Sequence, residues 1–88
     1  MEKIIDARYF VSKQEAHSVL RSALGEENYI GSNLDALHDC LTSICIPTEI
    51  RIINWSHAMY HLKAYANILW HVLDDSSEEN PCLHITID

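Results

Sequence analysis

Three short apolar runs, separated by long stretches of helical periodicity, most strongly constrain the fold of this chain. They lie within Glu2 to Ala7, Glu49 to Ile53 and Leu83 to Ile87. The pair Ile4 and Ile5 makes the first run β-branched and indicates a buried strand. In the other two runs apolar and polar residues alternate, which is typical of strands. Because helical segments separate these strands, we expect a small parallel three-stranded sheet with right-handed crossovers.

Two helices are predicted between the first and second strands. Ser12 precedes Glu15 by three residues, which is the spacing of a capping box, and an apolar stripe then continues to Gly25. A second apolar stripe follows the Gly-Ser-Asn sequence at 31–33 and ends before Pro47. These signals predict two helices in succession.

A third helical segment separates the second and third strands. It runs from Ser56 to Asp75 without Gly or Pro, and we expect a break near Trp55 to Tyr60. The acidic, polar segment from Asp74 to Pro81 predicts a loop. The expected fold is therefore α/β, in the order β-α-α-β-α-β, as one domain over residues 1–88 with the helices mainly on one face of the sheet.

Charge limits the kind of partner that the chain can bind. The sequence has 13 Asp and Glu against 6 Lys and Arg, so its net charge is 6 − 13 = −7. Nucleic acid is not expected as a direct partner, because contacts to phosphates need Lys or Arg. A chain of 88 residues also has no room for a large cofactor. We therefore expect a basic protein partner, no cofactor, and a monomer before binding, since acidic surfaces repel one another.

Location is indicated by what the sequence lacks. No apolar run approaches the roughly 18 residues of a membrane span, and the first residues do not resemble a secretory leader. Cys40, Cys45 and Cys82 form no CxxC pair and leave one cysteine over, which suits a reducing compartment. We expect no membrane association and a cytoplasmic location.

The helix expected after residue 33 has two unlike sides. At about 100° per residue, four polar residues share one side: Asp35, His38, Asp39 and Thr42. The other side is apolar: Leu34, Leu37, Leu41 and Ile44. Asp35 suits the positive end of the helix dipole, whereas Asp39 lies beyond the first turn and is repelled by Asp35. The spacing alone leaves open whether these carboxylates bind a partner or only stabilise the helix.

Two other groups of residues contain residue types found in metal or catalytic sites. His57 and His61 have the i, i+4 spacing of two metal ligands, but no further ligand accompanies them in a known pattern. His38, Asp39 and Cys40 are consecutive, and neighbours on a helix diverge by about 100°, so they do not converge on a substrate. We expect no metal site and no catalytic site.

The segment from Tyr29 to Thr42 resembles the signature of the barstar family of intracellular ribonuclease inhibitors. It contains the string Tyr-x-Gly-x-Asn-Leu-Asp-Ala-Leu-x-Asp-Cys-Leu-Thr. The resemblance extends over nearly the whole chain, including Pro47, Asn54-Trp55 and Cys82. It implies the family's fold, and a helix and preceding loop that plug the active site of a small basic ribonuclease, with two aspartates in the place of RNA phosphates.

The resemblance also implies which residues bind the partner. They are Tyr29, Gly31, Asn33, Leu34, Asp35, His38, Asp39 and Thr42, with Asp75 as a further acidic contact on the last helix. His38 and Ile44 stand where the family has tryptophans, and Ile30 replaces a tyrosine, so the aromatic contribution is smaller. The sequence thus predicts an inhibitor, not an enzyme, directed at a small basic ribonuclease or ribonuclease-like toxin. An acidic interaction or toxin-immunity module of the same fold, with another basic partner, stays open as the alternative.

Overall fold

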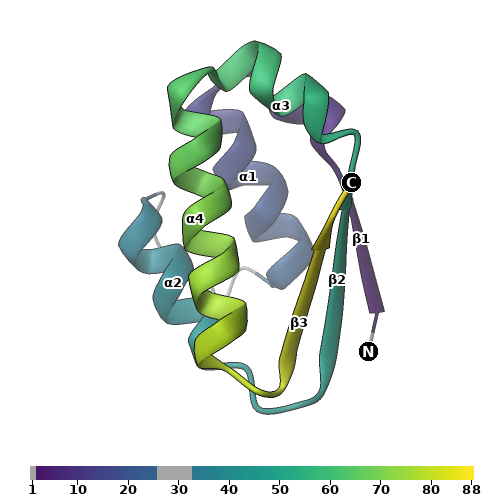
Figure 1. Cartoon of the computed structure of the whole chain (residues 1–88), viewed down its shortest axis with the longest axis vertical. Helices are drawn as coiled ribbons and strands as arrows, with labels where there is room; N and C mark the ends of the chain where they lie inside the picture. Colours follow the sequence, from purple (N-terminus) through teal and green to yellow (C-terminus); the bar gives the residue numbers. More distant parts are fainter. Residues whose placement is uncertain (1, 26–32) are drawn as a thin grey trace.

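A computed structural model describes residues 2–25 and 33–88 of the chain. The elements follow in this order: β1 (Glu2–Asp6), the 3-10 helix η1 (Ala7–Tyr9), α1 (Lys13–Leu24), α2 (Leu34–Thr42), β2 (Thr48–Ile53), α3 (Trp55–Leu62), α4 (Ala64–Glu79) and β3 (Leu83–Ile87). The predicted order β-α-α-β-α-β is confirmed, with α3 and α4 together forming the second crossover. Figure 1 shows the helices gathered on one side of the sheet.

The sheet is parallel throughout, with β2 in the centre. Ile5, Ile52 and Ile87 are register partners across the three strands and pack toward the helices. One row of register partners on the opposite face is polar and exposed: Glu2, Glu49 and His84. Parallel sheets are usually covered on both faces. In this sheet one face is exposed, and the helices and the core lie on the other face.

Ile4 lies on the exposed face of the sheet. The prediction that Ile4 and Ile5 are both buried is wrong for Ile4, which is 60% exposed, whereas Ile5 is 2% exposed. Successive residues of a strand point to opposite faces, and in this chain helices cover one face alone. The β-branched pair therefore identified the strand correctly but gave the wrong environment for one of its residues.

Asp6 joins the carboxyl ends of β1 and β2. Arg8 donates to Asp6 Oδ2 through Nε at 2.9 Å and through Nη2 at 2.6 Å, and Asn54 Nδ2 donates to Asp6 Oδ1 at 3.1 Å. The Arg8 contacts hold the pKa of Asp6 well below its usual range. Asn54 follows β2 in the left-handed region, with φ of 59°, which asparagine tolerates better than most residues.

Helix α1 has the predicted start and end. Ser12 Oγ accepts a hydrogen bond from the backbone N–H of Glu15 at 3.1 Å, which caps the first turn. Gly25 ends the helix with φ of 95°, a value that glycine adopts without a side-chain clash. Ala16 and Leu20 on its inner side are buried. The capping residues thus fix the length of α1, and its apolar stripe fixes which side packs on the core.

The break in the third helical segment lies later than predicted. Helix α3 runs without interruption from Trp55, and the chain bends at Lys63, which has φ of 55° and ψ of −122°. Lys63 Nζ lies over the Tyr60 ring, 5.8 Å from the ring centroid. This distance is within the limit of about 6 Å for a cation–π contact. A lysine with positive φ has no signature in a single sequence, so the position of the bend was not predictable from the pattern.

Helix α4 continues to Glu79, so the predicted loop from Asp74 onward is wrong for its first six residues. Ser76 faces the core and is fully buried, with its hydroxyl donating to the Val72 carbonyl at 2.7 Å. This burial of a small polar residue lets the helix stay packed through an acidic segment. At 16 residues α4 is the longest helix described, and no helix in the described ranges is long and apolar enough to cross a membrane.

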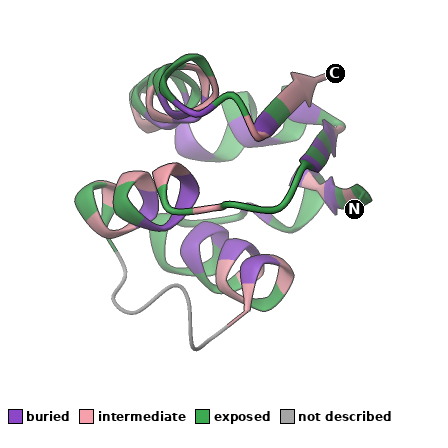
Figure 2. Ribbon diagram, turned by 90° about the horizontal axis from the view of Figure 1, so that it is seen from below, coloured by how far each residue is buried: buried purple, intermediate pink, exposed green. Residues whose placement is uncertain are grey.

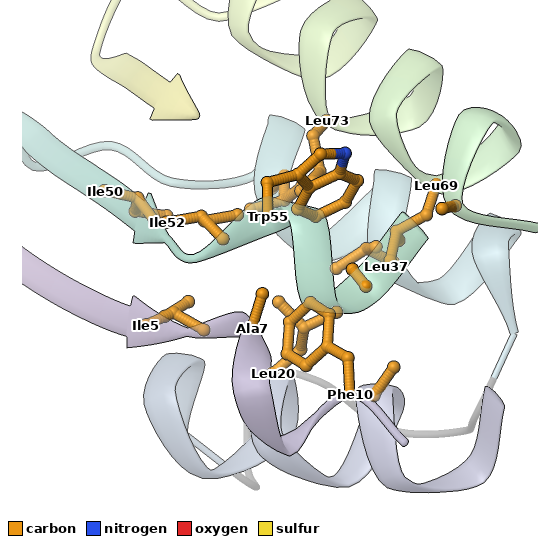
Figure 3. Packing of buried hydrophobic residues seen from close by; sticks show 14 of the residues in the cluster. Ile5, Ala7, Phe10, Leu20, Leu37, Ile50, Ile52, Trp55, Leu69 and Leu73 are labelled. Atoms are coloured by element: carbon orange, nitrogen blue, oxygen red, sulfur yellow. The ribbon is translucent and has the colours of Figure 1, made fainter. Parts of the chain in front are cut away.

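The core fills the space between the sheet and the helices (Figure 2). Phe10 and Trp55 meet edge to face, with ring centroids 6.2 Å apart. Figure 3 shows Leu37 of α2 and Leu69 of α4 pointing into the same cluster, and both are fully buried. Each such side chain stabilises the fold by roughly 1.5 to 3 kcal/mol through burial. The inner side of α2 is therefore held firmly against α4.

Candidate functional site

Helix α2 begins at Leu34 because Asn33 caps it. Asn33 Oδ1 accepts a hydrogen bond from the Ala36 N–H at 2.8 Å, which satisfies one free N–H group of the first turn. Leu37 and Leu41 are buried and fix the helix against the core. Asn33, predicted as a binding residue, therefore also determines where the helix that carries the aspartates starts.

The two aspartates of α2 point outward, as the helical spacing predicted. Asp35 lies in the first turn and Asp39 one turn later, and both are exposed. Asp39 also acts on its inward-facing neighbour: burial and, to a lesser degree, the Asp39 charge raise the pKa of the Cys40 thiol. The outward side of α2 thus presents two carboxylates to solvent, whereas Cys40, which follows Asp39, is buried in the core.

Asn80 ties the end of α2 to the end of α4. Its Nδ2 atom donates to the Leu41 and Ile44 carbonyls, each at 2.9 Å, and its Oδ1 atom accepts from the Cys82 N–H at 3.0 Å. Asn80 is 6% exposed, so these bonds lie in the interior. Asn80 was not predicted as a structural residue, because it lies within the predicted loop from Asp74 to Pro81. One amide side chain therefore sets how α2 lies beside α4.

The two helices joined in this way are strongly acidic. Neither contains Lys or Arg, and together they carry six carboxylates: Asp35, Asp39, Asp74, Asp75, Glu78 and Glu79. Five of these residues are exposed and Asp74 is half-buried. We call α2 and α4 with these six residues the acidic helix pair. Six of the thirteen acidic residues thus lie on two adjacent helices that contain no Lys or Arg.

His38 connects the two helices of the pair on its outer side. Its Nε2 atom lies 2.6 Å from Glu79 Oε2, and the two side chains are 42% and 57% exposed. The sequence analysis placed His38 beside Asp35 and Asp39 but missed Glu79, because Glu79 was assigned to a loop. The neighbour of His38 across the helix interface is therefore a carboxylate 41 residues further along the chain.

The other predicted binding residues have varied environments. Leu34 is half-buried and packs against the core. Thr42 is half-buried, and its hydroxyl donates to the His38 carbonyl at 2.8 Å, one turn earlier in the helix. Tyr29 and Gly31 lie outside the described residues. The structure thus brings Asp35, His38 and Asp39 together on one exposed side, with Thr42 at its end.

Asp75 lies on α4, the last helix, as predicted. Its carboxylate belongs to a group with those of Asp74 and Glu78, whose oxygens lie within 4.8 Å of one another. Glu79, one turn after Asp75, makes the contact with α2. The acidic contact that the resemblance assigned to Asp75 is therefore one member of a larger set of carboxylates on the same helix.

The comparison with known proteins bears on this acidic helix pair. The sequence matches the family Barstar (barnase inhibitor) over residues 1–87. The chain belongs to the barstar family. A barstar-like relative from Bacillus subtilis (strain 168), named "Putative ribonuclease inhibitor YrdF", is 35% identical over 77 residues, which cover 86% of this chain and 85% of the relative. The family assignment first indicated by the segment from Tyr29 to Thr42 is confirmed.

The described residues include further side chains that can bind metals or react: two histidines of α3, the carboxylates of α4 and the three cysteines. His57 and His61 are exposed on one side of α3, where they line a shallow hollow with Ser56 and Tyr60. Among the described residues, the one group of three or more potential metal ligands gathered together is the exposed carboxylate group of α4. The cysteines are free: Cys40 is buried, Cys45 exposed and Cys82 half-buried.

Proposed function

We propose that this protein inhibits a small basic ribonuclease by docking its acidic helix pair into the active site of the enzyme. Membership of the barstar family supports this proposal, as does the name of the Bacillus subtilis relative. The observation that carries it is the set of six carboxylates on α2 and α4 with no Lys or Arg in either helix. The protein acts as a binding partner and contributes no catalytic group.

The mechanism is occlusion combined with charge complementarity. A ribonuclease active site holds cationic side chains around the phosphate of its substrate. Asp39 is exposed on a helix that is fixed against the core, so its carboxylate can accept charge-assisted hydrogen bonds from an arginine or lysine of the enzyme. Asp35 provides a second anion one turn away. The carboxylates thus take the place of phosphates but offer no bond to cleave.

The net charge acts before contact is made. A charge of −7 attracts a basic enzyme over distances of about 10 Å at ordinary ionic strength and raises the association rate. The same charge makes two copies of this protein repel each other, so we propose that it is a monomer before binding. The free cysteines suit a reducing compartment, and we place the protein in the cytoplasm.

The test uses two variants that remove the same amount of charge from different faces. One carries Asp35→Ala and Asp39→Ala on α2, and the other carries Glu2→Ala and Glu49→Ala on the exposed face of the sheet. Cleavage of RNA by barnase is measured with the wild type and with each variant. The same three proteins are immobilised, exposed to a lysate of the source cell, and eluted with salt for a ribonuclease assay.

We expect the wild type and the sheet variant to inhibit barnase or to retain a ribonuclease from the lysate, and the α2 variant to do neither. Equal loss in both double variants would show that net charge alone drives binding and would contradict a specific docking surface. Retention of a basic protein without ribonuclease activity, lost in the α2 variant, would favour the interaction or immunity module instead.

A further inference from the structure

His38 occupies a special place in the acidic helix pair. Asp35 precedes it by one turn on α2, Asp39 follows it directly, and Glu79 of α4 lies 2.6 Å from its Nε2 atom. Within the two helices, His38 and His71 are the side chains that can carry a positive charge, and His71 lies elsewhere, against the Trp70 ring. His38 therefore decides how negative the surface beside Asp39 is.

The contact with Glu79 depends on the protonation state of His38. A protonated imidazole donates from Nε2 to the carboxylate and pairs two opposite charges. A neutral imidazole donates to Glu79 only in the tautomer with hydrogen on Nε2, and it then leaves the full negative charge on the carboxylate. Loss of the proton thus adds one unit of negative charge to the helix pair and frees Glu79 to accept from another donor.

We propose that docking of a cationic partner on the acidic helix pair is linked to loss of a proton from His38. This inference rests on the proposed function, because it concerns the same surface. An arginine or lysine approaching Asp39 is repelled by a protonated His38, and it competes with His38 for Glu79. The proton passes to the buffer as the partner's cation takes over the contact with Glu79.

The charged groups that face His38 also link the binding of a cation to the release of a proton. From its own helix these are Asp35 and Asp39, and from α4 it is Glu79. All are anions, so loss of the proton from His38 removes the positive charge from this group of side chains and strengthens its attraction for a cation. Affinity for a cationic partner should therefore rise with pH.

A hexa-arginine peptide is a suitable probe, because guanidinium groups do not titrate in this range. Its affinity is measured by calorimetry at about pH 5.5 and about pH 8, at one ionic strength. The proteins are the wild type, His38→Gln, Glu79→Gln, and His57→Gln as the matched control on α3, where His57 is exposed. His38 is half-exposed, so these variants are expected to fold.

Removing one positive charge about 4 Å from a bound cation changes affinity by about fivefold in water. We expect the rise in affinity between the two pH values to be about fivefold smaller in His38→Gln than in the wild type, and unchanged in His57→Gln. Glu79→Gln should weaken binding at high pH more than at low pH. Proton release on binding, obtained from buffers of different ionisation enthalpy, should be present in the wild type and absent in His38→Gln.

An equal pH dependence in the wild type and His38→Gln would overturn the proton linkage. Inhibition of barnase at about pH 8 tests the proposed function separately. If barnase is inhibited while the two proteins show the same pH dependence with the peptide, the proposed function stands and the linkage is wrong. If the peptide shows the linkage and no ribonuclease is inhibited, the linkage stands and the proposed function is wrong.

Discussion

The exposed face of the sheet and the acidic helix pair are both rich in carboxylates, but they differ in how those charges are balanced. On the sheet, Arg51 of β2 pairs with Asp88 at 3.0 Å, so a basic side chain balances one of the carboxylates there. On α2 and α4, six carboxylates stand without a Lys or Arg in either helix. Exposure and acidity are common to both faces, so the absence of Lys and Arg from α2 and α4 is the difference on which the proposed docking surface rests.

The largest expected difference between the two faces concerns Asp39. We expect Asp39→Ala to weaken binding to the cognate ribonuclease by roughly 2 to 5 kcal/mol, which is typical of removing one member of a desolvated charge pair at an interface. Stability should change by less than about 0.5 kcal/mol, because Asp39 is exposed. Inhibition constants and urea unfolding measure the two effects separately.

The matched control for this substitution is Glu49→Ala, which removes an exposed carboxylate from the sheet face. It should change binding only through the net charge, and that change should disappear as salt is added. The comparison fails if Glu49→Ala weakens inhibition as much as Asp39→Ala does, or if Asp39→Ala unfolds the protein.

A smaller effect is expected when the link between the two helices is removed. Asn80→Ala removes the side-chain donor to the Leu41 and Ile44 carbonyls. The Leu41 carbonyl keeps the Ile44 N–H at 3.4 Å, whereas the Ile44 carbonyl loses its donor, and an unsatisfied buried polar group costs about 1 to 3 kcal/mol. We expect this loss in the free energy of unfolding, with some loss of inhibition because α2 is held less firmly. Asn67→Ala, at an exposed position of α4, is the control that should leave both quantities unchanged.

Between about pH 7.5 and about pH 5.5, the pH dependence of folding should come mainly from a histidine in the interior. His17 is 1% exposed and contacts Tyr65 Oη at 2.6 Å. Burial and, second, the Arg21 charge lower the pKa of His17 below its ordinary value of 6.5. At pH values above 6.5, His17 is mostly neutral in both the folded and the unfolded chain, so it does not reduce the free energy of unfolding. As pH falls below 6.5, the unfolded chain takes up a proton that the folded chain excludes, and stability decreases.

Urea unfolding at several pH values from about 7.5 to about 5.5 measures this contribution. The free energy of unfolding should fall more steeply with decreasing pH in the wild type than in His17→Gln, whatever the absolute stability of the variant. His57→Gln, at an exposed position, should retain the wild-type slope. Equal slopes in all three proteins would show that His17 does not govern the loss of stability in acid.

The smallest effect is expected on the sheet face itself. Arg51 and Asp88 are 58% and 50% exposed, and exposed ion pairs contribute between 0 and about 1 kcal/mol. We expect Arg51→Ala to change stability within this range and to leave the affinity for a ribonuclease almost unchanged at moderate salt. A large loss of inhibition in Arg51→Ala would place part of the docking surface on the sheet.

Local patterns predicted much of the fold because they act over a few residues. Ser12 and Gly25 bound α1 through a cap and a positive φ that are visible in the sequence. Lys63 and Ser76 show where such patterns fail. The positive φ of Lys63 and the burial of Ser76 inside an acidic segment are set by packing between α3, α4 and the core, which no short window of sequence contains.

The candidate site likewise has a part that the sequence predicted and a part that it did not. Helical spacing placed Asp35 and Asp39 together because both lie on one short helix. The contact between His38 and Glu79, and the bonds from Asn80 to the end of α2, join residues about 40 positions apart. Contacts of this kind depend on how the helices pack, so they were not predictable from spacing.

The bonds made by Asn80 affect the entropy of association. Since one buried amide holds the end of α2 to the end of α4, and Leu37 and Leu69 fill the space between the helices, the backbone that carries the carboxylates is already ordered before a partner arrives. Ordering flexible segments on binding normally reduces affinity, and a preorganised surface avoids that loss. Within α2 and α4, the proposed partner then has to order the carboxylate side chains but not the backbone.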